Sequence, residues 1–453
     1  MTSFFKRPAR LLGVLLAGLA VGLPWQSAQA AHDIRGITGT TFNLYAYPAN
    51  IPLPEGTSLY MWLFGDMDAG ASATHPEGAG YALPQYPGPT LVVEQGAAVT
   101  ISLTNYGIPD AVSIVVTGHE VTATGGSPGL LTNAASIGDA APTTYSFTAS
   151  KPGTYLYHSL NGPNPGLHVE MGLVGVLIVR PSDGSRTAYG SGTGTDYDHE
   201  YLYLLTEVDP DIHAEMEVGH YTHFTNADRF AKIWFVNGRV FPDLFQADFD
   251  AVYPNQPYKS LAMTHPGAQT LVRNINGGQD SHPFHYHGEN LTFIARDGRI
   301  LSSDGLTANL GRSDNTINSP PKQAVDALWV WTGKNLGWDI YGHDTNHTCT
   351  DSDGDGFADG TSTYPGEYCP DHGKAFPVTL PGVGELTLGA WYSGSPFLGD
   401  VGDLPPGEGG LNPFGGYFFV WHSHAEKELT TFNIFPGGTL SAVVVLPPSV
   451  PIQ

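Results

Sequence analysis

The sequence has little charge, few cysteines and no long apolar run. Charged residues make up 14% of its 453 residues, against roughly 25% in an ordinary globular protein. The 43 Asp and Glu outnumber the 19 Lys and Arg, and the net charge of −24 argues against binding to a phosphate backbone. No apolar stretch reaches the roughly 18 residues that suggest a membrane-spanning helix. Heptads and a glycine period are also missing, which excludes a coiled coil and collagen.

The first 30 residues have the three parts of a signal peptide. Residues 6–10 contain three basic side chains, residues 11–23 are apolar, and residues 28–30 (AQA) form a small-residue cleavage site. We therefore expect export to a periplasm or to the extracellular medium. The chain has two cysteines, Cys349 and Cys369. In an oxidising compartment we expect them to form a disulfide bond.

The 57 glycines and 36 prolines separate short segments of alternating or continuous apolar residues. Examples are residues 90–94 (TLVVE), 98–102 (AVTIS) and 175–179 (GVLIV). Short segments bounded by turn residues are typical of β-sandwiches. A strand ending in His-Ser occurs twice, in residues 153–160 and 416–424, which predicts two domains of one kind.

The domain boundaries follow from composition. Residues 183–197 are rich in Gly, Ser and Thr and are predicted to be a linker. After the signal peptide (1–30), we expect a first domain over 31–182 and a second over 198–453. The second domain is too long for a simple sandwich, so we expect an insertion at about 302–412.

Four of the 18 histidines form two His-x-His pairs. The segment HPFHYHG contains His285 and His287, and WHSH contains His422 and His424. Residues i and i+2 of a strand point to the same side of the sheet. Each pair therefore presents two imidazoles in one direction, an arrangement that suits copper or zinc.

Four longer motifs carry a family resemblance. They are YPGPTLVVEQGAAVTISLTN (86–105), GTYLYHSLNGPNPGLHVEMGLVGVLIVRP (153–181), HPFHYHGENLTFIARDG (282–298) and GYFFVWHSHAEKELTTF (416–432). Together they resemble the multicopper oxidases and their relatives, the two-domain copper nitrite reductases. The resemblance implies an all-β fold of two cupredoxin-like Greek-key β-sandwich domains, the second with the long insertion, and copper as cofactor.

The resemblance places histidines of this chain at copper-ligand positions. His285 takes the place of a type-2 ligand, and the type-3 positions are taken by His158, His287, His422 and His424. His119 matches a further histidine of the first domain. On the pattern of the nitrite reductases, we expect one copper to lie among His119, His158 and His424.

The departures from the family concern its type-1 copper, which requires a cysteine thiolate. Serine stands at both thiolate positions, Ser159 and Ser423. The family has a histidine five positions after the second thiolate, and in this chain that position is Glu428. The retained partners, His168 and His282, are therefore weaker copper candidates. We expect a copper site made of histidines alone.

The insertion contains the segment DSDGDGFAD (351–359), which resembles the opening of a calcium-binding loop. Carboxylates at alternate positions converge on one hard cation, and a glycine permits the sharp turn. The candidate calcium ligands are Asp351, Asp353, Asp355 and Asp359. Ser362 stands where an EF-hand has its bidentate Glu, and Glu367 is a candidate for the missing ligand.

Three functions are open from the sequence. The first is a copper-dependent oxidoreductase in which a small-molecule substrate or an electron donor reaches the histidine-bound copper directly. The second is a copper-binding protein for storage, delivery or resistance. The third is a structural or interaction protein with a vestigial site. The resemblance implies a homotrimer with copper between subunits, and an interface within one chain stays equally open.

Overall fold

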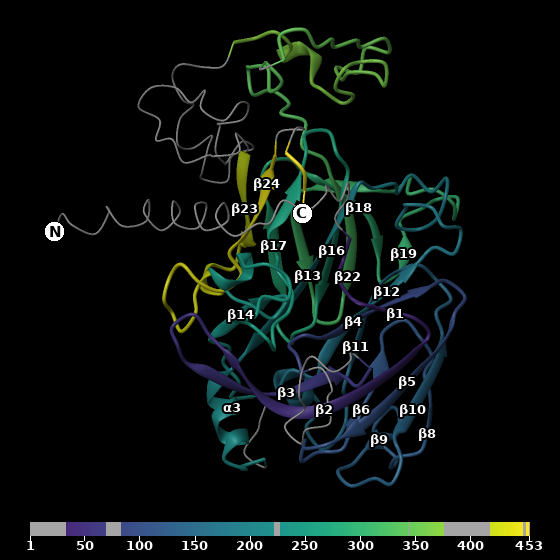
Figure 1. Ribbon diagram of the computed structural model, residues 1–453, viewed down its shortest axis with the longest axis vertical. Helices are drawn as coiled ribbons and strands as arrows, with labels where there is room; N and C mark the ends of the chain where they lie inside the picture. Colours follow the sequence, from purple (N-terminus) through teal and green to yellow (C-terminus); the bar gives the residue numbers. More distant parts are fainter. Residues whose placement is uncertain are drawn as a thin grey trace, which may run out of the picture.

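The computed structural model describes residues 33–68, 83–221, 227–342, 344–375, 417–446 and 450–452, and most of its regular structure is β-strand. The predicted signal peptide and residues 376–412 of the predicted insertion lie outside the described residues. Figure 1 shows a first lobe, in purple and blue, below a second lobe, in teal to yellow. No helix in the described ranges has the length and apolar character needed to cross a membrane.

The first lobe is a sandwich of two sheets, with strand orders β1-β4-β12-β11-β7 and β3-β2-β5-β10-β8. The first sheet contains β1 (Ile37–Thr38), β4 (Gly88–Glu94), β7 (Val115–Val116), β11 (Gly153–His158) and β12 (Val174–Arg180). The second contains β2 (Thr41–Pro52), β3 (Ser58–Asp66), β5 (Ala98–Asn105), β8 (Thr122–Thr124) and β10 (Thr143–Thr148). A separate pair consists of β6 (Val112–Ser113) and β9 (Ala134–Ala135).

The second lobe is also a sandwich of two sheets. The inner sheet has the order β14-β13-β16-β22-β18-β19, with β20 paired to β18, and the outer sheet has the order β15-β24-β23-β17-β21. The inner strands are β13 (His199–Val208), β14 (Ile233–Val236), β16 (Thr270–Asn276), β18 (Leu291–Arg296), β19 (Arg299–Ile300), β20 (Arg312–Asp314) and β22 (Ala324–Trp329). The outer strands are β15 (Ala262–Thr264), β17 (His282–Tyr286), β21 (Thr316–Ser319), β23 (Tyr417–Ser423) and β24 (Ser441–Val445).

Helical structure in the described ranges is limited to short segments. The α-helices are α2 (Pro165–Glu170) and α3 (Pro210–Glu217), and the 3-10 helices are η1 (Asp243–Phe245), η2 (Cys369–Asp371) and η3 (Glu426–Leu429). Both α-helices begin with proline, whose fixed φ suits the first helical position and whose missing N–H costs nothing there.

Three apolar clusters lie between the four sheets. Strand β11 shows how they are arranged, because its residues are buried on both faces. Tyr155 and Tyr157 belong to the core of the first lobe, whereas Leu156 joins Leu204 and Ile275 of the second lobe in a shared cluster. A strand buried on both faces reads as a continuous apolar run rather than as an alternation. The two lobes are thus joined by a hydrophobic interface.

The predicted linker, residues 183–197, connects the last strand of the first lobe to β13. It is held by contacts along its length: Thr187 and Asp196 form a β-bridge, Ala188 is fully buried, and Tyr189 donates a hydrogen bond from its hydroxyl to Asp326 at 2.5 Å. The segment therefore packs against the second lobe despite its Gly/Ser/Thr-rich composition.

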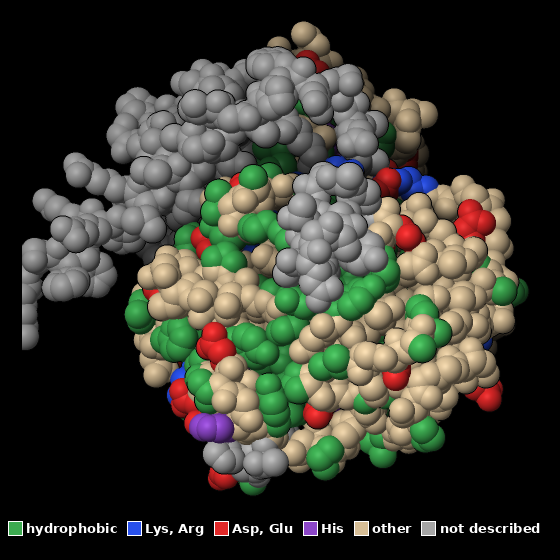
Figure 2. Space-filling view, turned by 60° about the horizontal axis from the view of Figure 1, so that its bottom comes forward, with side chains coloured by type: hydrophobic (Ala, Val, Ile, Leu, Met, Phe, Trp, Pro, Cys, Tyr) green, Lys and Arg blue, Asp and Glu red, His purple; other side chains and the backbone are tan. Residues whose placement is uncertain are grey.

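The surface agrees with the low charge content. On the face shown in Figure 2, acidic side chains are scattered singly among hydrophobic and uncharged polar ones. The prediction of an all-β chain built from two sandwiches is confirmed.

Candidate metal centre

Four histidines gather on the outer face of the second lobe. Strands β17 and β23 are paired so that His285 lies opposite His422. Their neighbours Phe284, Tyr286 and Trp421 point inward to the core of this lobe. Because side chains alternate along a strand, His285 and His422 point outward. His287 and His424, two residues further along each chain, join them, as the two His-x-His pairs predicted.

The four rings are close to one another. Ring centroids lie 4.4 Å apart for His285 and His424, 4.7 Å for His285 and His287, and 5.2 Å for His422 and His424. The Nε2 atoms of His287 and His422 are 3.1 Å apart, a separation that two ligands of one ion have. In the described ranges, no three of the four place nitrogens within 4.8 Å of one another. Binding one ion with three of them therefore requires ring rotations.

The environment keeps three of these rings, those of His285, His287 and His422, neutral near pH 7. Burial, then neighbouring histidines, lower the pKa of His285 to about 4 and that of His287 to about 3, and burial also lowers the pKa of His422. The Nδ1 atom of His422 lies 2.8 Å from the Ser423 carbonyl oxygen, which only accepts, so Nδ1 donates. Its Nε2 keeps a lone pair for a metal. The hydroxyl of Thr316 lies 2.8 Å from Nδ1 of His285 and orients that ring.

His282 begins β17 and points to the opposite side, between two buried carboxylates. Its Nδ1 lies 2.9 Å from Glu428 and its Nε2 lies 2.8 Å from Glu207. Burial lowers the pKa of His282, but hydrogen bonds to the two glutamates outweigh it and raise the pKa to about 10. A doubly protonated imidazole has no lone pair for a metal. The structure therefore argues against His282 as a copper ligand. The family has copper-binding histidines at the positions of His282 and Glu428, and in this chain these two residues form an ion pair.

The corresponding residues of the first lobe, Ser159 and His168, are hydrogen-bonded to each other. The hydroxyl of Ser159 accepts from the Ser113 backbone N–H at 3.0 Å and lies 2.7 Å from Nδ1 of His168. Nε2 of His168 faces the Asp110 carboxylate at 3.4 Å. Because a carboxylate only accepts, Nε2 donates, and the lone pair of Nδ1 then accepts from the Ser159 hydroxyl. Both nitrogens of His168 thus have partners, which argues against its prediction as a copper ligand.

His119 lies in the bend after β7, on the side of β11 that faces the first-lobe core, whereas His158 lies on the other side. The predicted set of His119, His158 and His424 is therefore not among the groups of three or more ligand atoms that lie within 4.8 Å in the described ranges. The ring of His119 packs against Tyr155 and Phe147, at centroid distances of 4.5 and 5.1 Å. Both aromatics belong to the first-lobe core. His158 follows Leu156 by two residues on β11 and therefore faces the second lobe. Because the two rings lie on opposite sides of β11, they do not share one metal.

The predicted disulfide between Cys349 and Cys369 is present, with Cα atoms 5.6 Å apart. The predicted calcium loop lies between these cysteines. Carboxylate oxygens of Asp351, Asp353 and Asp355 lie within 4.8 Å of one another. The carboxylate of Asp359 is outside this group and accepts a hydrogen bond from the backbone N–H of Ser352 at 2.9 Å.

A second cluster of metal-ligand residues was not predicted from the sequence. Asp339, His347, Glu367 and His372 place one ligand atom each within 4.8 Å of one another. The candidate calcium ligand Glu367 thus belongs to this cluster. A signal was present, because His347 lies two residues before Cys349 and His372 three residues after Cys369.

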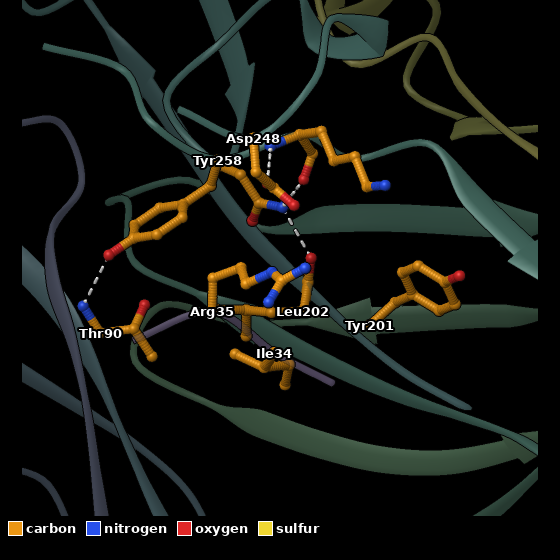
Figure 3. Close-up of a pocket in the computed structure, with 9 residues that line it drawn as sticks. Ile34, Arg35, Thr90, Tyr201, Leu202, Asp248 and Tyr258 are labelled. Atoms are coloured by element: carbon orange, nitrogen blue, oxygen red, sulfur yellow. Dashed lines mark hydrogen bonds between the residues drawn. The ribbon is translucent and has the colours of Figure 1, made fainter. Parts of the chain in front are cut away.

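The pocket in Figure 3 lies between β4 of the first lobe and β13 of the second. Its lining residues are Ile34, Arg35, Thr90, Tyr201, Leu202, Asn237, Asp248, Tyr258 and Lys259. The hydroxyl of Tyr258 accepts a hydrogen bond from the Thr90 backbone N–H at 3.0 Å, which ties the lobes together. No predicted ligand lines it, so this pocket is separate from both clusters.

Comparisons with known proteins agree with this architecture. Residues 81–184 match the family model described as multicopper oxidase. The solved structure of multicopper oxidase mgLAC aligns with a TM-score of 0.51 at 17% identity, over 91% of this chain and 87% of that one. A blue copper oxidase from Nitrosomonas europaea aligns with a TM-score of 0.50 at 16% identity, over 89% and 85%. No curated protein matches the sequence significantly.

Residues 81–184 of the first lobe are therefore similar to a multicopper oxidase domain, and both lobes have the cupredoxin-like β-sandwich fold that is seen in multicopper oxidases. The resemblance drawn from the sequence motifs is confirmed.

Proposed function

We propose that the protein is an exported, copper-dependent oxidoreductase that uses a copper held by histidines alone. The observation that carries this proposal is the cluster of His285, His287, His422 and His424 on the outer face of the second lobe, together with the multicopper oxidase domain. Neutral imidazoles are suitable ligands for copper. Bound copper would supply one-electron redox chemistry.

The residues of the cluster have different roles in this proposal. His287 and His422, whose Nε2 atoms are 3.1 Å apart, would hold the ion between adjacent strands. His285, oriented by Thr316, would complete a three-ligand set after a ring rotation. His424 is exposed and lies where a small molecule reaches the cluster from solvent.

Electrons would enter at this cluster directly. The family's thiolate positions are occupied by Ser159 and Ser423, and each is part of a fully buried arrangement. A hydroxyl does not replace the soft thiolate of a type-1 site. We therefore expect a small-molecule reductant, or a donor protein that docks on the outer face of the second lobe.

Serine in place of cysteine at both thiolate positions also favours a second candidate function, a copper-binding protein for storage, delivery or resistance without turnover. A vestigial site in a structural protein is the third. Oxygen uptake with a reductant distinguishes the first function from the other two. Retention of copper after desalting distinguishes the second from the third.

The decisive test compares copper content in two variants. We expect His422→Ala to lose most of the copper that the wild type retains after loading and desalting, because it removes one of the closest pair. The matched control is His119→Ala, which removes a histidine outside the cluster and should leave copper content unchanged. Equal copper retention in wild type and His422→Ala would refute the site.

Two further proposals accompany this function. The carboxylates of Asp351, Asp353 and Asp355 are proposed to bind calcium, as the loop motif predicts; Asp353→Asn should then abolish any rise in melting temperature on adding calcium. A homotrimer with copper between subunits is proposed from the family resemblance, and light scattering of the exported protein tests it.

A further inference from the structure

The cluster in the insertion has the geometry of a four-ligand metal site. Oε1 of Glu367 lies 3.1 Å from Nε2 of His347 and 2.8 Å from Nδ1 of His372, and these two nitrogens are 3.1 Å apart. Oδ2 of Asp339 lies 3.5 Å from Nε2 of His347. Ligands about 2.0–2.1 Å from a tetrahedral ion are separated by roughly 3.3 Å. The four ligand atoms therefore surround a space that fits one ion.

The tautomer of His347 is fixed from outside the cluster. Its Nδ1 lies 2.5 Å from the backbone carbonyl oxygen of Asp344, which accepts only, so Nδ1 carries the hydrogen. In the neutral ring, Nε2 then has its lone pair directed into the cluster. Outer-shell hydrogen bonds of this kind orient metal-binding histidines.

The carboxylates are also held in place. Asp339 accepts hydrogen bonds from the backbone N–H groups of Tyr341 at 2.8 Å and Gly373 at 2.7 Å. Glu367 is 2% exposed, and its Oε2 has no hydrogen-bond partner among the described residues. A buried carboxylate oxygen without a partner is costly. A cation bound at the cluster removes this cost.

The cluster also concentrates negative charge. The two carboxylates, Asp339 and Glu367, bring two negative charges into a largely buried space. One divalent cation among the four ligand atoms neutralises both carboxylates. His372 has a side chain 34% exposed, which leaves a path for the ion to enter.

The donor set selects the class of ion. Two imidazole nitrogens and two carboxylate oxygens are ligands of zinc, whereas calcium takes six to eight oxygen ligands. We propose that Asp339, His347, Glu367 and His372 bind one zinc ion that fastens the insertion. This site is distinct from the predicted calcium loop, which presents oxygen ligands alone.

The position of the site indicates a structural role. Trp338, beside Asp339, belongs to the core of the second lobe and donates from its indole N–H to the Tyr417 hydroxyl at 2.9 Å. Glu367 and His372 flank the disulfide cysteine Cys369. The ion thus joins the segment anchored on the sheet to the disulfide-closed loop. Tyr417 begins β23 and the copper-candidate His422 lies five residues further on, about 17 Å away along the strand.

The test measures zinc in the full-length exported protein by mass spectrometry. The histidine cluster of the second lobe is first filled with copper, and the protein is then loaded with zinc and desalted. We expect about one zinc per chain in the wild type and at least a tenfold lower content in His372→Ala. The matched control is His424→Ala, which removes an exposed histidine from the other cluster and should retain zinc fully. The two variants also keep this proposal separate from the copper proposal, because each removes a ligand from one cluster.

A second variant and a spectroscopic measurement distinguish the loss of a zinc ligand from misfolding of the protein. Glu367→Gln preserves the side-chain shape and should also lose zinc while keeping the wild-type circular dichroism. Cobalt bound to the wild type should show the visible bands of a four-coordinate ion, and these should be absent in His372→Ala. Full zinc retention in both variants, copper in place of zinc at this cluster, or zinc loss in His424→Ala would each overturn the proposal.

Discussion

The sharpest prediction concerns His282, which the sequence presents as a copper ligand and the structure places between two carboxylates. The perturbation is His282→Gln, which keeps a polar side chain of similar length and removes the positive charge. The variant leaves Glu207 and Glu428 buried beside each other without the cation that separates them. Breaking a buried ion pair by removing one partner costs about 3–5 kcal/mol.

The pKa of His282 gives a second value for the free energy of unfolding that the His282→Gln substitution removes. The pKa rises from 6.5 to about 10 on folding, so the folded protein binds this proton more tightly than the unfolded chain does. The stabilisation is fully present below pH 6.5, is still about 4 kcal/mol at pH 7, and is lost as the pH rises through 10. The stability difference between wild type and His282→Gln should therefore shrink between pH 7 and pH 10.

The assay is urea unfolding at pH 7 and at pH 10, together with copper content at pH 7. The matched control is His285→Gln, the same substitution on the same strand but on the opposite face. We expect it to change the free energy of unfolding by less than about 1 kcal/mol and to lower copper content. If His282→Gln loses copper while its stability is unchanged, the ion-pair interpretation is wrong.

Three other outcomes follow from the structure. The copper-loaded protein should have no intense blue absorption, because serine stands at both thiolate positions (Ser159 and Ser423); a strong blue absorption would contradict this. His424→Ala should lower copper content and leave the disulfide intact, as mass spectrometry checks. Replacing Cys349 and Cys369 by serine should destabilise the insertion by about 3 kcal/mol, since the bond closes a loop with a sequence separation of 20, and limited proteolysis should detect faster cleavage.

Local sequence patterns are sufficient to predict the fold class and the main histidine cluster. Short segments bounded by glycine and proline predicted strands, and two His-x-His pairs predicted rings on one side of each strand. Both inferences depend on the two-residue period of a strand, which is a local property. The period places His285 with His287 and His422 with His424 wherever the strands lie. The family motifs then added the cupredoxin-like arrangement, which the comparisons confirm.

The contacts of the remaining candidate residues depend on how distant segments pack. His282 contacts Glu207 and Glu428, which are 75 and 146 positions away. No short motif therefore indicates that His282 is an ion-pair partner rather than a copper ligand. His119 and His158 match family positions, yet the two faces of one sheet separate them. The set of Asp339, His347, Glu367 and His372 also depends on how irregular loops fold back on one another, for which no local period exists. A periodic pattern fixes the direction of a side chain, but only the packing of distant segments determines what that side chain meets.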